Sequence, residues 1–230
     1  MKIVGIHEHR GSGWLEVEEP LLSIDIMLDI ANKFPDLEFI DFGGGFGVPH
    51  KPDQGSLDLK SLGIEFSKKI DDFKRSYCRN FVCRFEPGRY LVAEAGDLLA
   101  EVTILKKSPE GLVFAGTDSG MNQLVRVAMY DSYHPITNIG NPDGDEEIYD
   151  ICGNVCESAD FFGKRRGFAK IREGDILSIG IAGAYGMSMA SNYQFRSLPA
   201  EVLVDGSIVH LINPRQTFSD LIDRYGFNIP

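Results

Sequence analysis

Glu38-Phe39-Ile40-Asp41-Phe42-Gly43-Gly44-Gly45-Phe46-Gly47 decides how the first part of the chain folds, because an apolar, β-prone run leads directly into a glycine-rich turn. Before it, residues 21–34 predict a helix closed by Pro35. After it, residues 59–77 predict a helix whose apolar face consists of Leu59, Leu62, Phe66, Ile70, Phe73 and Tyr77. With further strands predicted at 3–5 and 81–85, this order indicates a parallel sheet, because parallel neighbours need long crossovers.

The pattern changes after Gly96, where short β-prone runs alternate with turns rich in Gly, Pro, Asn and Asp. This is typical of an antiparallel β-barrel or sandwich. Asp205-Gly206 predicts a hairpin turn, and residues 217–225 predict a terminal helix that returns toward the first domain. The runs lie at 101–105, 112–115, 146–151, 175–181, 201–204 and 208–212. We therefore expect an α/β domain at residues 1–95 and an all-β domain at residues 96–230.

Composition limits the classes of function. The chain has 230 residues, a formal net charge of -11 and a pI near 4.9, which argues against a nucleic-acid partner. The one tight basic run, Lys164-Arg165-Arg166, is interpreted as a solvated loop. Four cysteines in a chain of this length indicate reduced thiols. No apolar run approaches the roughly 20 residues that span a bilayer, so we expect no membrane partner and a cytoplasmic location.

Two clusters in the first domain suggest ligand binding. Backbone N–H groups of Gly43, Gly44 and Gly45 could hold a phosphate, although a plain tight turn after a strand also explains the glycines. His7 and His9 share one face at the end of a strand and could bind a metal, but no further ligands are evident, and a structural or hydrogen-bonded histidine is the plainer interpretation of either one.

Three more clusters carry candidate chemistry, each with a plainer alternative. Glu86-Pro87-Gly88-Arg89 ends a strand, and its Glu–Arg pair could simply lie on the surface. Arg126 and Tyr130 could belong to a loop with a solvated arginine. Cys152 and Cys156 could form half of a zinc site or be structural cysteines, while Glu157 places a carboxylate directly beside a thiol.

Taken together, these clusters resemble the diaminopimelate decarboxylases, which use pyridoxal 5'-phosphate (PLP). The resemblance rests on His7-Glu8-His9-Arg10-Gly11-Ser12-Gly13, the glycine loop, Glu86-Pro87-Gly88-Arg89, Cys152-Gly153-Asn154-Val155-Cys156-Glu157-Ser158-Ala159-Asp160, Gly183-Ala184-Tyr185 and Ser191-Asn192-Tyr193. The variants Gly120-Met121-Asn122 and Gly183-Ala184-Tyr185-Gly186-Met187-Ser188-Met189 look most like the decarboxylase half of bifunctional aspartokinase/decarboxylases. The resemblance implies that the chain is the C-terminal part of a PLP-binding (β/α)8 barrel followed by a β-barrel or sandwich domain. The lysine that links to PLP in this family lies upstream of the residues present here.

The resemblance also implies roles for single residues. His9 would stack on the PLP ring, Glu86 would pair with the pyridine nitrogen, and the glycine loop, Ser12 and Tyr185 would hold the phosphate. Arg89 and Tyr185 would contact the substrate, Arg126 and Tyr130 would bind its distal carboxylate, Cys156 would donate a proton, and Glu157 would contact the distal amine. In the family the Cys-Glu segment serves the partner subunit, which implies a homodimer.

Three positions depart from the family pattern: Val127 replaces a proline, Ala159 a glycine and Gln194 an asparagine. Ala159 would be strained if its φ were positive. The expected function is decarboxylation of meso-2,6-diaminopimelate to L-lysine. The alternatives are a related ornithine, arginine or carboxynorspermidine decarboxylase, and a non-catalytic paralogue that regulates an active enzyme. Arg126 and Glu157 together favour diaminopimelate, because ornithine has no distal carboxylate for an arginine to bind.

Overall fold

The computed structural model describes residues 1–77 and 79–223. They divide into two compact units between Ala95 and Gly96, where the sequence pattern changes. Each unit has a hydrophobic core of its own.

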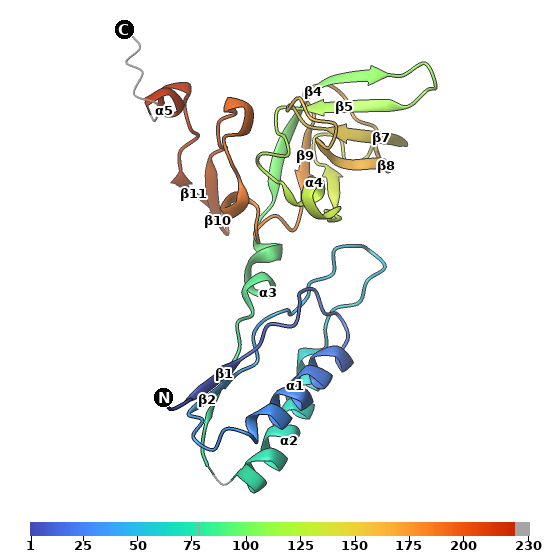
Figure 1. Ribbon diagram of the computed structural model, residues 1–230. Helices are drawn as coiled ribbons and strands as arrows, with labels where there is room; N and C mark the ends of the chain where they lie inside the picture. The colour runs from blue at the N-terminus through green and yellow to red at the C-terminus, as the bar shows by residue number, and fades with distance from the viewer. Residues whose placement is uncertain (78, 224–230) are drawn as a thin grey trace. The chain divides into compact units, whose positions relative to one another are not determined.

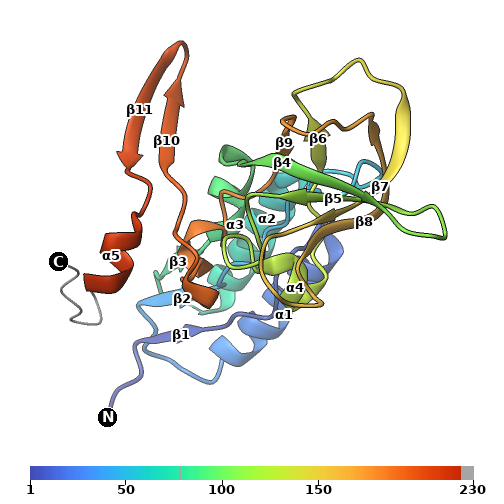
Figure 2. The same ribbon diagram turned by 90° about the horizontal axis from the view of Figure 1, so that it is seen from above.

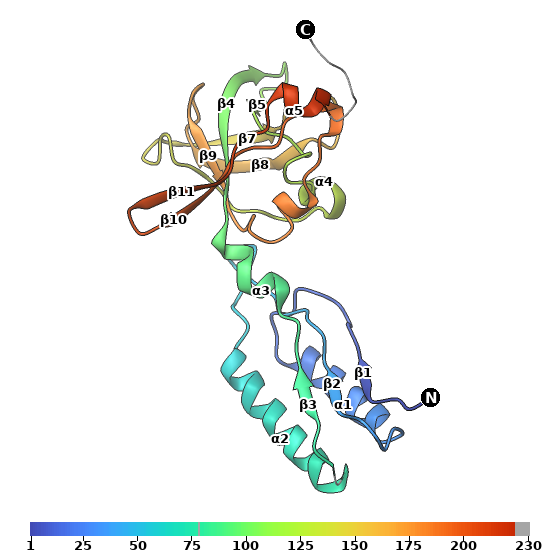
Figure 3. The same cartoon turned by 90° about the vertical axis from the view of Figure 1, so that its left-hand side faces the viewer.

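Unit 1 is a three-stranded parallel sheet with two long helices (Figure 1). Its strands run in the order β1 (Gly5–His7), β2 (Phe39–Asp41) and β3 (Val82–Arg84), side by side in Figure 3, and the crossovers contain α1 (Glu18–Ala31) and α2 (Leu59–Tyr77). The predicted parallel pairing is confirmed. The three strands and their connections do not by themselves make a closed barrel.

The two helices cover one face of this sheet. Ile6, Ile40 and Cys83 lie in one row of the register and pack into the core with both helices. Helix α1 begins three residues before the predicted start, because the first turn accepts Pro20 and favours the acidic Glu18 and Glu19. It also ends at Ala31, well before Pro35, so the predicted C-terminal boundary was late.

Unit 2 contains a six-stranded sheet in the order β6-β9-β4-β5-β7-β8 (Figure 2). The prediction of a wholly antiparallel domain is wrong at one pair, because β5 and β7 run parallel. The other four pairs are antiparallel. Bounds are β4 Leu98–Lys107, β5 Val113–Thr117, β6 Ile136–Asn138, β7 Glu146–Cys152, β8 Phe161–Ala169 and β9 Ile176–Ile179.

The sheet is nearly closed around its core. The side-chain amide of Asn138, at the end of β6, donates to the carbonyl oxygens of Ala169 and Lys170 at 3.4 and 3.2 Å, next to the end of β8. The two edge strands therefore approach one another. The enclosed core includes Ala100, Val102, Ala115, Leu124, Tyr149, Ile151, Phe162, Phe168, Ile171, Leu177 and Ile179.

The interpretation of Lys164-Arg165-Arg166 as a solvated loop is wrong, because all three residues lie in β8. The Arg166 guanidinium donates to the carbonyl oxygen of His134 at 2.5 Å and lies 3.8 Å from the ring centroid of Tyr133. Burial lowers the pKa of Arg166, and the charges of Tyr133 and Asp131 oppose this effect. Lys164 and Arg165 are exposed, whereas Arg166 is partly buried, and all three belong to the strand.

Asp175 anchors the turn before β9. Burial would raise its pKa, but hydrogen bonds from Arg172 and Asn138 outweigh burial and hold the pKa below the ordinary value of 3.8. Its Oδ2 accepts from the Asn138 amide at 3.0 Å and from the Arg172 N–H at 2.8 Å. The carboxylate thus fixes two segments of the nearly closed sheet.

The last elements form a separate hairpin and a short helix. Strands β10 (Glu201–Asp205) and β11 (Ile208–Asn213) pair antiparallel around Asp205-Gly206, which confirms the predicted turn, and Figure 2 shows them apart from the six-stranded sheet. Helix α5 spans Phe218–Asp223, and the rest of the predicted helix up to Tyr225 lies outside the described residues. Shorter helices are α3 Gly88–Val92, η1 Ala93–Ala95, α4 Arg126–Tyr130, η2 Met187–Met189 and η3 Tyr193–Phe195. Among the described helices, none is long and apolar enough to cross a membrane.

Candidate functional site

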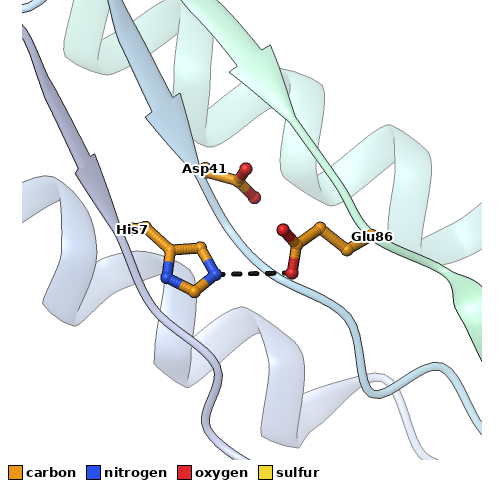
Figure 4. A group of neighbouring side chains, drawn as sticks. All are labelled: His7, Asp41 and Glu86. Atoms are coloured by element: carbon orange, nitrogen blue, oxygen red, sulfur yellow. Dashed lines mark hydrogen bonds and ion pairs between the residues drawn. The ribbon is translucent and has the colours of Figure 1, made fainter.

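The uncovered face of the unit 1 sheet gathers one imidazole and two carboxylates. His7 ends β1, Asp41 ends β2 and Glu86 follows β3, and their ligand atoms all lie within 4.8 Å of one another (Figure 4). The Nε2 atom of His7 is 3.4 Å from Oε2 of Glu86. The structure therefore gives His7 two acidic neighbours that its spacing from His9 does not predict.

Close packing against the backbones of Glu8 and Glu86 requires glycine at two positions of the loop. A Cβ on Gly43 would lie 2.1 Å from the carbonyl oxygen of Glu8, and one on Gly44 would lie 2.3 Å from the carbonyl oxygen of Glu86. Gly43 and Gly45 also have positive φ values of 67° and 108°, which favour glycine. Within the described part of the chain, the N–H groups of Gly44 and Gly45 donate no hydrogen bond, so both can serve an anion.

A second loop lies against the glycine loop. The carbonyl oxygen of Gly45 accepts from the N–H groups of Gly13 and Trp14 at 2.9 and 3.0 Å. These bonds bring the exposed Ser12 beside the glycines. His9 is exposed as well, and its ring lies 3.7 Å from where a Gly44 Cβ would be. Four predicted cofactor contacts of unit 1, namely His9, Ser12, the glycine loop and Glu86, thus occur in one neighbourhood.

Arg89 is carried by α3, directly after the Glu86-Pro87 corner, and is half-buried. Its burial disagrees with the alternative of a plain surface Glu–Arg pair. Glu86, by contrast, is exposed. The two side chains therefore have different surroundings although only two residues separate them.

In unit 2, three predicted substrate residues meet around one guanidinium. Arg126 begins α4 and is only 7% exposed, so the alternative of a solvated arginine is wrong. Its guanidinium carbon lies 5.3 Å from the ring centroids of both Tyr130 and Tyr185, and Nη2 donates to Ser132 Oγ at 3.3 Å. Tyr185 has φ of 61°, an uncommon backbone state for a bulky residue. A guanidinium flanked by phenol rings can receive a carboxylate.

Cys156 and Glu157 follow β7 and are both exposed. Gln194 holds the Cys156 backbone at both ends, since its Oε1 accepts from the Cys156 N–H at 2.9 Å and its Nε2 donates to the carbonyl at 3.3 Å. The Tyr193 hydroxyl donates to Glu157 Oε1, and this bond raises the pKa of Tyr193. Gln194, which stands where the family pattern has asparagine, therefore makes two hydrogen bonds to the Cys156 backbone.

Asp160 joins the two loops that carry these residues. Its Oδ1 accepts from the Met121 N–H and its Oδ2 from the Val155 N–H, both at 2.6 Å. Burial raises its pKa, although both hydrogen bonds act against that rise. Ala159 does not have a positive φ, so the backbone strain that a positive φ would cause at this position is absent.

Cys152 does not share the environment of Cys156. It is half-buried, and burial together with the charges of Asp150 and Asp160 raises its pKa to about 11. Among the described cysteines, neither of the two joins a group that could hold a metal. Cys83 is also a free thiol, and Cys78 lies outside the described residues.

The geometry of unit 1 fits PLP. The available N–H groups of Gly44 and Gly45 suit its phosphate, the carboxylate of Glu86 suits its pyridine nitrogen, and the exposed His9 ring offers a stacking surface. Sequence reasoning did not find Asp41, Asp160 or the hydrogen-bonding role of Gln194. Asp41 could have been noticed, because it ends β2 in the same way that His7 ends β1.

Residues 27–183 match the family model described as "Pyridoxal-dependent decarboxylase, C-terminal sheet domain". A protein named diaminopimelate decarboxylase from Methanothermobacter thermautotrophicus is 43% identical over 99% of this chain and 54% of its own length. A protein of the same name from Methanocaldococcus jannaschii is 36% identical over 97% of this chain and 51% of its own length.

Solved structures agree in fold. The crystal structure of diaminopimelate decarboxylase from M. jannaschii superposes with a TM-score of 0.88 at 34% identity, over 99% of this chain and 52% of that chain. The same enzyme in complex with L-lysine gives a TM-score of 0.85 at 35% identity and the same coverage. The chain spans about half the length of the relatives it matches.

Proposed function

Since the chain belongs to the pyridoxal-dependent decarboxylases, we propose that the complete protein decarboxylates meso-2,6-diaminopimelate to L-lysine. The observation that carries this proposal is the 43% identity to a diaminopimelate decarboxylase across 99% of the chain. Arg126 supports the choice of substrate, because its guanidinium, flanked by the rings of Tyr130 and Tyr185, suits a distal carboxylate. Ornithine has no distal carboxylate.

In unit 1, the chain's own groups hold and polarise the cofactor. When bound, PLP supplies an electron sink for the electron pair that remains as CO2 departs. Gly44 and Gly45 donate backbone hydrogen bonds to the phosphate, and Ser12 assists from the neighbouring loop. Glu86 pairs with the pyridine nitrogen and keeps it protonated, while His9 stacks on the ring.

In unit 2, Arg126 and Tyr130 bind the distal carboxylate, and Tyr185 contacts substrate and phosphate. Cys156 donates a proton to the α-carbon, and Glu157, oriented by Tyr193, contacts the distal ammonium. Arg89 binds a substrate carboxylate from α3. We also propose a homodimer in which residues 152–160 serve the partner's site, a cytoplasmic location, and a closer relation to bifunctional aspartokinase/decarboxylases. Free thiols at Cys83, Cys152 and Cys156 support the location.

The test uses the purified complete protein with PLP and diaminopimelate, and measures CO2 and lysine. We expect Cys156→Ala to lower kcat by about 10²- to 10⁴-fold with little change in KM, because a positioned proton donor is lost. Cys152→Ala is the matched control and should stay within a few-fold of the parent. If Cys156→Ala behaves like its control, the thiol is structural.

The 230-residue chain alone gives a second arm of the test. None of the strands β1, β2 and β3 contains a lysine that could link to PLP. We therefore expect no CO2 release from this chain with added PLP. Turnover by it would contradict the assignment of the missing lysine to the upstream part of the protein.

A further inference from the structure

We propose that unit 1 carries a second binding site, for a small alkylammonium ion, between its sheet and helices α1 and α2. A cavity of about 270 Å³ lies there. Five aromatic residues line it together with aliphatic and small ones, and these five are Trp14, Phe42, Phe46, Phe66 and Phe85. The volume is close to the lower limit of about 300 Å³ for ordinary ligand pockets, so the ligand must be small.

The five rings form one continuous surface. Phe66 contacts Phe42 and Phe85 edge-on, with centroids 5.1 and 4.9 Å apart. Phe46 lies 6.0 Å from Phe85 and 6.3 Å from Trp14. Aromatic faces carry negative charge density and attract cations, most strongly where water is excluded.

Glu8 is the one ionisable side chain among the residues that line the cavity. Its Oε1 accepts a hydrogen bond of 2.5 Å from the hydroxyl of Ser23, a residue of α1 that is only 2% exposed. Within the described part of the chain, Oε2 has no hydrogen-bond or ion-pair partner. Glu8 is half-buried and places this carboxylate oxygen beside the aromatic rings, where a positive donor can pair with it.

The cavity lies on the opposite face of the sheet from the cofactor residues. Side chains alternate between the two faces along a strand, so Glu8 points away from its neighbours His7 and His9. Phe42 and Phe85 alternate in the same way with Asp41 and Glu86. The proposed ion therefore does not occupy the site that holds PLP.

Other ligand classes fit the cavity less well. A carboxylate or phosphate would be repelled by Glu8. Divalent metal ions such as Ca²⁺ take about six to eight oxygen ligands, whereas the lining offers one carboxylate and two serine hydroxyls. A neutral hydrocarbon would make no charged contact with Glu8. An ammonium on a short alkyl chain pairs with Glu8 and covers the rings with its tail.

Gly63 gives space to this cavity from within α2. It is a lining residue, and a Cβ added to it would meet no atom within 4 Å. Glycine inside a helix is less favourable than alanine, so Gly63 does not stabilise α2. What Gly63 contributes locally is open volume in the cavity. A larger side chain at this position should fill the cavity without breaking the helix.

The test is calorimetric titration of the complete protein with N,N-dimethylbutylammonium, a tertiary amine that does not condense with an aldehyde cofactor. 1-Hexanol, which also has six carbons but no charge, is the matched ligand. We expect Glu8→Gln to weaken the cation at least about tenfold and to change hexanol less than about twofold, because a charge-assisted contact is lost. Gly63→Leu should abolish binding of both ligands, while Gly63→Ala should keep it.

Two results would overturn the proposal. Equal affinity of the parent protein for both ligands would show that Glu8 recognises no charge. Cation binding that persists in Gly63→Leu would place the ion elsewhere. Gly63→Leu still tests the proposal if Glu8→Gln does not fold. Gly63 lies outside the proposed catalytic groups, so the Gly63 variants should retain decarboxylase activity.

Discussion

Replacing Asp160 should loosen two loops at once, the one that leads to Arg126 and the one that carries Cys156. Its carboxylate accepts the Met121 and Val155 N–H groups at 2.6 Å and is only 4% exposed. Hydrogen bonds to charged groups are worth about 1.5–3 kcal/mol each, so Asp160→Ala should cost about 3–6 kcal/mol of local stability. Relief from burying a charge offsets part of this loss.

Asp160→Asn is the sharper perturbation because it preserves shape. Its amide oxygen can accept one N–H, but its NH2 group then faces the other donor, so about 1.5–3 kcal/mol should be lost. Amide hydrogen exchange reports such local opening even where a two-unit protein does not unfold in one step.

We expect whichever of the Met121 and Val155 amides faces the new NH2 group to exchange about 10- to 100-fold faster in Asp160→Asn, since 1.4 kcal/mol corresponds to tenfold. Asp143→Asn, a change at an exposed aspartate of the same unit, should leave both rates unchanged. Unaltered exchange at both amides in Asp160→Asn would refute the idea that this carboxylate holds the loops together.

Three further predictions follow from individual groups. Iodoacetamide at pH 7.5 should alkylate the exposed Cys156 much faster than Cys152, because the pKa of Cys152 is raised to about 11. Peptide mass spectrometry measures both rates, and faster alkylation of Cys152 would contradict the prediction. The pKa of Asp175 is lower in the folded state, so its contribution to stability is present above about pH 4 and is lost as pH falls through the folded pKa. Asp175→Asn should therefore reduce the fall in Tm between about pH 4 and lower pH. An unchanged dependence of Tm on pH in this variant would contradict the prediction. Arg126→Met should lower kcat/KM for diaminopimelate at least about tenfold and spare lysine or ornithine, whereas equal losses would assign Arg126 to the fold.

The local pattern sufficed for the α/β unit. Periodicity placed α2 at its observed bounds, Leu59–Tyr77, because its apolar face packs into the core from Phe66 to Tyr77. Three short apolar runs separated by helices allowed only a parallel sheet. The start of α1 was missed because Pro20 was not weighed as a residue of the first helical turn.

The β unit was harder to predict because its pairing is nonlocal. Strand β8 contains Lys164, Arg165 and two glycines, so its composition resembles a loop, yet it makes a long ladder with β7. The parallel pair β5–β7 joins strands separated by β6 and α4, and alternation within either strand carries no information about the direction of its neighbour. Hairpin signals such as Asp205-Gly206 are local and were therefore reliable.

The candidate site shows the same division between local and nonlocal information. The glycines at 43–45 could be ascribed to either a phosphate or a tight turn from sequence, and the structure shows that close approach of the Glu8 and Glu86 backbones demands glycine in any case. The His7, Asp41 and Glu86 cluster depends on the register of three strands, which places residues 34 and 45 positions apart within 4.8 Å. Because each side chain ends or follows its own strand, the carboxyl edge of the sheet, and not any single motif, creates this cluster. A variant that shifted one strand by a single residue would turn its side chain to the helix-covered face and remove it from the site while leaving the motif intact.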